Sequence, residues 1–194
     1  MIKDCTAIVM AGGGSRRMGC DKANLIVGEK ILLQTVAATM QQLFPRVIVS
    51  VRQPRAGIDL LQVCDEQPDG GPLAGLVAGL SHITTPWAFA VACDMPFIVP
   101  EVVELLAGYR SWHQAVVPVV HGHSQPLAAF YAASCLVPLR AGLVAQQKRL
   151  RNVLEQLDVH YVDEAGMLEA DPYLRSFFDL DTPQDVALAL NGWR

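Results

Sequence analysis

A glycine-rich stretch follows the first apolar run of the chain. Residues 6–10 are apolar, and Ala11 is followed directly by Gly12, Gly13 and Gly14. Glycine lets the backbone turn freely and lets its N–H groups approach an anion closely. A buried strand that ends in such a loop is therefore a candidate phosphate-binding site.

Three cationic side chains lie in the same stretch, namely Arg16, Arg17 and Lys22. Guanidinium and ammonium groups neutralise phosphate charge. The spacing excludes a Walker A loop, because Cys20 and Asp21 occupy its Lys and Ser/Thr positions. It also excludes the dinucleotide fingerprint, because Arg17 stands where a third glycine is required. We therefore predict a different loop, which wraps a phosphate chain and directs cationic side chains at it.

Two aspartates are candidate metal ligands. Asp94 comes directly after the most apolar run of the chain, residues 87–93. Ligands bind beyond the carboxyl ends of strands in open α/β sheets, and Mg²⁺ prefers oxygen donors. A turn before Pro96 is the alternative role for Asp94. Asp181 either caps a helix over residues 183–190 or joins Asp94 at the metal.

A second glycine-containing segment is predicted to contact a nucleotide base. Asp65 follows a short strand, and the segment Gly71, Pro72 and Leu73 comes soon after it. We interpret these residues as base-recognising. The small residues at 74–79 favour close packing of a helix on the sheet.

Strand-like and helix-like patterns alternate along the chain. Strands are predicted at 6–10, 47–51, 61–64, 87–93, 115–120, 127–131 and 159–162, and helices at 31–44, 72–83, 100–109, 136–157 and 183–190, with a break near Gly142. This alternation predicts an α/β fold, a three-layer αβα Rossmann-like single domain with a mostly parallel sheet. Residues 121–123 are predicted to form a hairpin tip beside Gln125 and Pro126, which are candidate substrate contacts. Residues 163–178 are predicted to be a long irregular segment.

Composition argues against several classes of protein and of binding site. The chain has 194 residues, of which 52% are hydrophobic, and a net charge of −4. A net negative charge argues against nucleic-acid binding through bulk electrostatics. Five cysteines without a CxxC pair suggest reduced thiols rather than a zinc site. With no signal-peptide pattern and no apolar stretch of membrane-spanning length, a cytoplasmic location without membrane contact is expected.

Together these motifs resemble the molybdenum cofactor guanylyltransferases, members of the nucleotidyltransferase superfamily with a glycine-rich start. The matching segments are residues 11–22, the Gly-Pro-Leu-Ala-Gly of residues 71–75, the Cys-Asp-Met-Pro-Phe of residues 93–97, and the Asp-Thr-Pro of residues 181–183. The Ala-Gly-Gly start is similar to the guanylyl branch, whereas the cytidylyl branch tends to begin Ala-Ala-Gly.

The resemblance implies transfer of GMP from GTP to the terminal phosphate of molybdopterin, with release of pyrophosphate. By this resemblance the glycine loop and Lys22 hold the triphosphate, with Arg16 and Arg17 among the groups that neutralise it. Asp65 and residues 71–73 lie near ribose and guanine, and Asp94 binds Mg²⁺. The C-terminal part of the single domain receives the pterin. Molybdoenzymes and other cofactor-biosynthesis proteins are candidate partners.

Two departures from the family pattern leave the choice of base open. Many members have Asn where this chain has Asp179 and Asp181, and Asn is common where it has Ser50. The alternatives are a related nucleotidyltransferase that uses CTP or a sugar phosphate and, from another class, a non-catalytic carrier of the cofactor. A carrier is disfavoured because the cationic loop residues and Asp94 are all retained.

Overall fold

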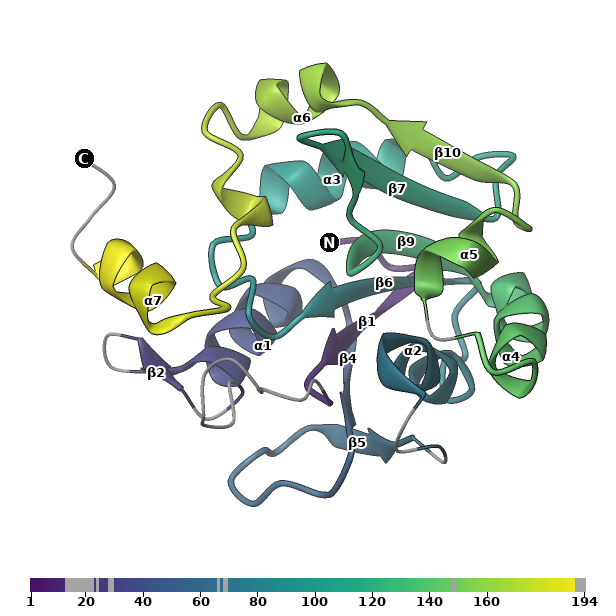
Figure 1. Ribbon diagram of the computed structural model, residues 1–194, viewed down its shortest axis with the longest axis horizontal. Coiled ribbons are helices and arrows are strands. Elements are labelled where there is room, and N and C mark those ends of the chain that lie inside the picture. The colour runs from purple at the N-terminus through teal and green to yellow at the C-terminus, as the bar shows by residue number, and fades with distance from the viewer. Residues whose placement is uncertain are drawn as a thin grey trace.

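The computed structural model of the chain describes residues 1–12, 23, 25–27, 30–65, 67, 70–147 and 149–190. Figure 1 shows a central sheet with helices on both of its faces. The strands are β1 (Cys5–Met10), β2 (Ile26–Val27), β3 (Lys30–Ile31), β4 (Arg46–Val51), β5 (Leu61–Cys64), β6 (Trp87–Ala92), β7 (Ala115–Val120), β8 (His123–Ser124), β9 (Ala128–Ala132) and β10 (Val159–Val162).

The main sheet has the strand order β10-β7-β9-β6-β1-β4-β5, and β8 pairs with β7 at its side. Parallel pairing joins β1 to β4 and to β6, β4 to β5, and β7 to β10. Strand β9 pairs antiparallel with both β6 and β7. Along this path β9 therefore runs against the others, and the prediction of a mostly parallel sheet is confirmed.

The helices are α1 (Leu32–Leu43), α2 (Gly71–Leu80), α3 (Pro100–Gly108), α4 (Leu136–Val144), α5 (Leu150–Leu154), α6 (Glu164–Ala170) and α7 (Pro183–Leu190). One core cluster joins α1, α3 and α6 to one face of the sheet. A second cluster joins α2, α4 and α5 to the other face. These two cores make the three-layer αβα architecture predicted from the sequence.

Strand β1 supplies both cores because successive side chains point to opposite faces of a sheet. Ala7 and Val9 pack with α1 and α3, whereas Ile8 and Met10 pack with α2. All six residues of β1 are buried, as expected for a central parallel strand covered on both sides. The burial of β1 places its carboxyl end deep in the molecule.

Helix α2 lies unusually close to β1 because it carries glycine where the two elements meet. A Cβ atom on Gly79 would lie 2.6 Å from Cγ2 of Ile8, and one on Gly75 would lie 2.8 Å from Cε of Met10. Neither separation leaves room for a methyl group. The packing role predicted for the small residues of this segment is confirmed.

The segment from 136 to 157 is two helices, as predicted, and the break comes shortly after Gly142. Helix α4 continues through Gly142 and ends at Val144, and Gln146 then adopts a positive φ of 56°. Gly142 serves packing instead, because a Cβ there would lie 2.7 Å from Cγ2 of Val153 in α5. The chain therefore turns back so that α5 can pack against α4.

The segment from 163 to 178 was predicted to be irregular, and this prediction was wrong. It contains α6 and a short 3-10 turn, η3 (Arg175–Phe177). The Asp163 carboxylate accepts a hydrogen bond from the Gly166 N–H at 3.0 Å, which caps α6. The buried Asp171 carboxylate accepts from the Ser176 N–H at 2.7 Å. Local side-chain caps of this kind order a segment that has no strong apolar periodicity.

The hairpin tip was predicted correctly, whereas the hairpin of β2 and β3 was not predicted. Val120 pairs with His123, and between them His121 and Gly122 have positive φ angles of 51° and 72°. Positive φ at both central residues is the type I′ pattern favoured in two-residue hairpins. Each strand of the β2–β3 pair is only two residues long, too short to show a hydrophobic alternation.

Candidate active site

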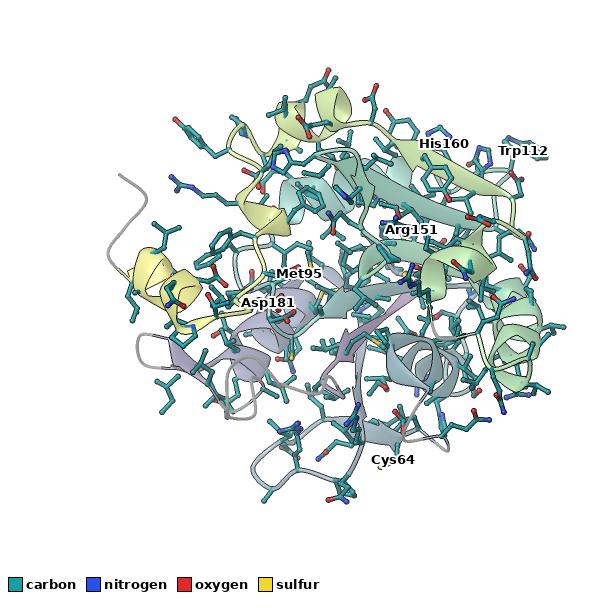
Figure 2. All side chains as sticks on the ribbon, viewed as in Figure 1. Cys64, Met95, Trp112, Arg151, His160 and Asp181 are labelled. Atoms are coloured by element: carbon teal, nitrogen blue, oxygen red, sulfur yellow. The ribbon has the colours of Figure 1, made fainter. Side chains whose placement is uncertain are left out.

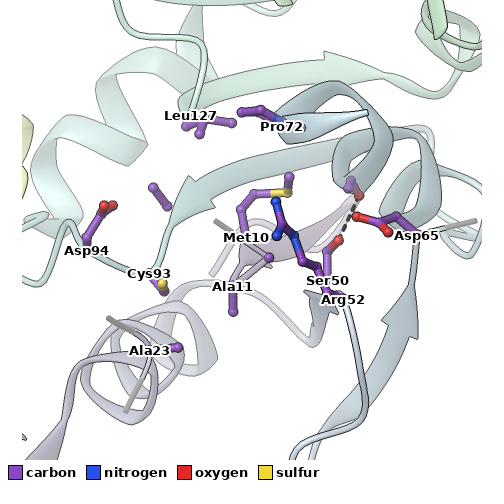
Figure 3. A pocket seen from close by; sticks show the side chains of 14 residues that line it. Met10, Ala11, Ala23, Ser50, Arg52, Asp65, Pro72, Cys93, Asp94 and Leu127 are labelled. Carbon is purple, nitrogen blue, oxygen red and sulfur yellow. Dashed lines mark hydrogen bonds between the residues drawn. The ribbon is translucent and has the colours of Figure 1, made fainter. Parts of the chain in front are cut away.

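A cavity of about 290 Å³ opens at the carboxyl ends of four neighbouring strands (Figure 3). These strands lie in the order β6, β1, β4, β5, and the first turn of α2 closes the cavity from the side. Residues that are far apart in the sequence meet here because each follows a strand of the same sheet. This is the edge at which open α/β sheets bind ligands.

Most of the predicted binding residues within the described part of the chain line this cavity. They are Ala11, Gly12, Asp65, Gly71, Pro72 and Asp94. Leu73 does not, because its side chain is fully buried in the core under α2. The Leu73 side chain therefore has a packing role, and the place of this residue near the base stays a prediction.

The other predicted phosphate-binding residues lie outside the described residues. They are Gly13, Gly14, Arg16, Arg17 and Lys22. Their contacts with phosphate stay predictions. The described residues next to them, Ala11 and Gly12, show where the glycine-rich stretch leaves the sheet.

Backbone hydrogen bonds hold the end of β1 in the middle of the cavity. The Ala11 N–H donates to the Ser50 carbonyl at 2.8 Å, and the Cys93 N–H donates to the Met10 carbonyl at 3.0 Å. The Arg55 guanidinium donates to the Ala11 carbonyl at 3.1 Å. Because these bonds extend the sheet pairing past the last residue of β1, the start of the glycine-rich stretch has a defined position.

Asp65 lines this cavity and carries one buried carboxylate oxygen. Its Oδ1 is buried and accepts no hydrogen bond from the described residues. Desolvation raises the pKa of the Asp65 carboxyl, while the nearby Arg52 guanidinium opposes this rise in pKa. A buried acceptor without a partner costs free energy, so its presence at a cavity wall indicates a ligand-binding group.

Replacing Asp65 with asparagine is expected to stabilise the unliganded protein at neutral pH. A pKa raised in the folded state means that ionised Asp65 destabilises the fold above its unfolded pKa of about 3.9. Below about pH 3 the carboxyl is protonated in both states, so the variant's advantage should vanish there. Thermal unfolding of both proteins across this pH range measures the difference. A variant less stable than the parent at pH 7 would contradict this account of Asp65.

The segment that carries Asp181 lies beside Asp94 although 86 residues separate the two aspartates in the chain, and Asp94 lines the cavity whereas Asp181 is outside its lining. The Leu180 N–H donates to the Asp94 carbonyl at 2.9 Å, which fixes the segment carrying Asp181 next to Asp94. Figure 2 shows Asp181 close to Met95, the residue after Asp94. The hydroxyl of Thr182, rather than Asp181, accepts from the Asp185 N–H at the start of α7. This finding weakens the alternative role of Asp181 as a helix cap.

Two cavity residues were not predicted from the sequence. Arg52 lines the cavity one residue beyond β4, and Leu127 lines it one residue before β9. Arg52 could have been found by the rule that identified Asp65 and Asp94, since all three follow strand ends. Leu127 could not, because only the antiparallel insertion of β9 next to β6 places it there.

A second, more open hollow of about 460 Å³ adjoins the first. The two share Pro72 and Leu127 as lining residues. The exposed side chains of Arg149 and Arg151 line the second hollow beside Pro126, and Figure 2 shows Arg151 at α5. Pro126 was a predicted substrate contact; it lines this hollow, and its contact with a substrate stays a prediction.

The family model of the MobA-like NTP transferase domain matches residues 7–161 of the chain. The chain belongs to this family. The resemblance inferred from the glycine-rich start and the later motifs is thereby confirmed, and this MobA-like chain is a nucleotidyltransferase.

Individual relatives of the MobA-like chain agree with this assignment. A probable molybdenum cofactor guanylyltransferase from Chloroflexus aggregans is 39% identical over 94% of this chain and 92% of the relative. One from Pelotomaculum thermopropionicum is 33% identical over 95% and 91% of the two chains.

Solved structures show the same MobA-like fold. The molybdopterin-guanine dinucleotide biosynthesis protein A of Archaeoglobus fulgidus matches with a TM-score of 0.85 and 28% identity, over 96% of this chain and 97% of that one. A 2-C-methyl-D-erythritol 4-phosphate cytidylyltransferase from Thermus thermophilus matches with a TM-score of 0.70 and 17% identity, over 95% and 97% of the two chains. At that identity the second match shows the fold alone.

Among the described residues of this MobA-like chain, every helix is too short or too polar to cross a bilayer.

Proposed function

We propose that the chain transfers GMP from GTP to the terminal phosphate of molybdopterin, forming the guanine dinucleotide cofactor and pyrophosphate with the help of Mg²⁺. One observation carries the proposal. A single cavity at the carboxyl edge of the sheet gathers Gly12, Asp65, Pro72 and Asp94 from separate motifs of a MobA-like chain. The names of the relatives from Chloroflexus and Pelotomaculum support the choice of GTP and of the cofactor.

In this proposal the chemistry needs no side-chain nucleophile. A phosphate oxygen of the acceptor attacks the α-phosphorus of GTP in line, the bond to the bridging oxygen breaks, and pyrophosphate leaves. The protein lowers the barrier by holding two anions together and by neutralising their charge. The glycine-rich stretch, Lys22 and one of the adjacent arginines Arg16 and Arg17 are proposed for this neutralisation.

Asp94 and Asp181 are the residues that would hold Mg²⁺. Their carboxylates are oxygen donors, and the backbone hydrogen bond from Leu180 to Asp94 places the segment that carries Asp181 beside Asp94. No cluster of three or more His, Cys, Asp or Glu side chains suited to a metal is found among the residues that the structure describes. This pair fits the usual Mg²⁺ site, which has one or two carboxylates completed by substrate phosphates. When bound, the ion supplies positive charge to the phosphates.

The second hollow is proposed to hold the acceptor. This hollow adjoins the cavity at the strand ends, which we call the nucleotide cavity, at Pro72 and Leu127. A molecule in the hollow would therefore lie beside the bound nucleotide. Arg149 and Arg151 supply positive charge there, as an acceptor phosphate requires. The N-terminal part of the chain would then bind the nucleotide, while the C-terminal part would bind the pterin.

Pyrophosphate release tests the proposal most directly. Each of the four common nucleoside triphosphates is incubated with the protein, molybdopterin and Mg²⁺, and release is compared with and without the acceptor. The proposal expects release with GTP only when molybdopterin is present. Release with CTP in place of GTP would make the chain a cytidylyltransferase. Tight binding of the nucleotide or pterin without any release would make it a cofactor carrier.

Removing both Arg149 and Arg151 is expected to weaken acceptor binding selectively. Loss of these exposed charge-assisted contacts should raise the KM for molybdopterin by about tenfold, with the KM for GTP unchanged. The matched control is Arg140→Ala, since Arg140 is an exposed arginine on α4 that donates to Ser81 at 2.9 Å. An equal rise in both KM values would contradict the placement of the acceptor in this hollow.

A further inference from the structure

Arg52 extends into the nucleotide cavity from the end of β4. Its side chain is exposed and lines the cavity. Figure 3 shows its guanidinium directed toward Met10 and the interior of the cavity. The Cγ atom of Arg52 lies 3.5 Å from the place where a Cβ of Gly12 would be. This is an ordinary van der Waals separation, so the Arg52 side chain runs alongside Gly12 at this wall of the cavity.

Asp65 presents a hydrogen-bond acceptor next to the Arg52 guanidinium, which is a hydrogen-bond donor. Its Oδ2 atom lies 3.9 Å from the same Cβ position of Gly12, so both side chains border one small region. The other oxygen, Oδ1, is buried and unpartnered among the described residues. One end of the cavity therefore offers the hydrogen-bond donors of Arg52 beside the carboxylate acceptor of Asp65.

This end of the cavity lies far from the proposed metal ligands. Asp65 and Asp94 follow strands β5 and β6, which are separated by β4 and β1. Three strand spacings amount to about 14 Å. A nucleotide with its phosphates near Asp94 therefore has its base at the opposite end of the cavity, near Arg52 and Asp65.

We propose that Arg52 is a specificity-determining residue that donates a hydrogen bond to O6 of guanine, while Asp65 accepts from the N1–H and the 2-amino group of the same base. The inference rests on the proposed function for the identity of the nucleotide. Guanine presents one acceptor and two donors along this edge, and an arginine next to a carboxylate matches that order. Adenine has an amino group where guanine has O6, so it would place a donor against the guanidinium.

A phosphate contact is the competing role for Arg52. A cation that binds phosphate strengthens the binding of every nucleoside triphosphate to a similar extent, because the phosphates are shared. A contact to O6 affects only bases that carry this oxygen. Nucleotides altered at single base atoms therefore separate the two roles.

Equilibrium binding without acceptor is measured by calorimetry for GTP, 6-thio-GTP and ITP. The 6-thio analogue replaces O6 with sulfur, a weak acceptor, and retains both base donors, whereas ITP lacks only the 2-amino group. The parent protein is expected to bind GTP about tenfold more tightly than either analogue. In Arg52→Met the preference for GTP over 6-thio-GTP should disappear, and the preference over ITP should remain. In Asp65→Asn the preference over ITP should disappear.

Arg46→Met is the matched control, because Arg46 begins the same strand at its opposite end and donates to Thr84 at 2.6 Å. This variant should leave unchanged the preference for GTP over 6-thio-GTP and the preference for GTP over ITP. An equal loss of affinity for all three nucleotides in Arg52→Met would show a phosphate contact and overturn the inference. An unchanged preference for GTP over 6-thio-GTP in that variant would also overturn it.

Failure of the inference can be told apart from failure of the proposed function. If the parent releases pyrophosphate from GTP with molybdopterin but Arg52→Met keeps its discrimination at O6, only the inference about Arg52 fails. If the parent binds CTP more tightly than GTP and transfers from CTP, the proposed function fails, and the inference fails with it.

Discussion

Replacing Asp94 with alanine is expected to lower the rate of pyrophosphate release on the order of 10²–10³-fold while leaving the fold intact. Asp94 lines the cavity two residues after the end of β6 and lies beside the segment that carries Asp181. Its carboxylate would hold the Mg²⁺ ion of the proposed site, and without that ion the negative charge on the phosphates would lose a principal stabilising group. The carboxylate itself is half-buried rather than part of the core, so the packing around β6 should survive.

The measurement compares initial rates of pyrophosphate release across a range of Mg²⁺ concentrations. Asp59→Ala, which removes an exposed carboxylate outside the cavity, is the matched control and should keep the parent rate. Thermal unfolding of both variants reports on the fold. A near-parent rate for Asp94→Ala at every Mg²⁺ concentration would remove Asp94 from the proposed metal site.

Replacing Phe89 with alanine is expected to lower the free energy of unfolding by about 3–5 kcal/mol, more than any other substitution proposed for this protein. Phe89 is fully buried in β6, the strand that precedes Asp94. Its ring centroid lies 4.7 Å from that of Phe130 and 5.8 Å from that of Phe44. Truncation removes the central ring of this cluster, and the neighbouring elements cannot collapse far enough to fill the space.

Urea unfolding followed by circular dichroism measures this loss. Tyr173→Ala is a suitable control, since 77% of the Tyr173 side chain is exposed. A surface change of this kind should alter the free energy of unfolding by no more than about 0.5 kcal/mol. A comparable loss in both variants would show that the three phenylalanines do not form the principal core on this face.

Much of the fold could be predicted from local patterns. The strands β5, β7 and β10 and helix α7 have the predicted bounds, and β1, β4, β6 and β9 differ by a residue or two at an end. Continuous β-branched and apolar runs identify buried strands, because both of their faces must be covered. A short capped helix or a two-residue strand is too short to show a hydrophobic periodicity, so α6 and the β2–β3 hairpin were not predicted.

The candidate site was predicted in part. Gly12, Asp65 and Asp94 were predicted because they follow apolar runs that mark strand ends, Ala11 because it opens the glycine-rich stretch, and Gly71 and Pro72 because a glycine-containing turn can pass close to a ligand. All six line the cavity. The inward direction of the Leu73 side chain could not be predicted, because a motif does not show which of its side chains turn inward. Its neighbour Pro72 is exposed at the cavity, whereas Leu73 is one helical position further round and faces the core.

The sequence by itself determined the chemical inventory of this protein: a glycine-rich cationic stretch, two separate aspartates suited to Mg²⁺, and a family resemblance that the comparisons confirm. Only the tertiary structure decided which of these groups meet. Strand order is set by non-local pairing, and it places Arg52 beside Asp65. A backbone hydrogen bond from Leu180 to Asp94 places the segment that carries Asp181 beside Asp94, across 86 residues of chain. Local patterns report which residues are buried or turned, whereas the partners across a sheet depend on contacts between segments that are distant in the chain.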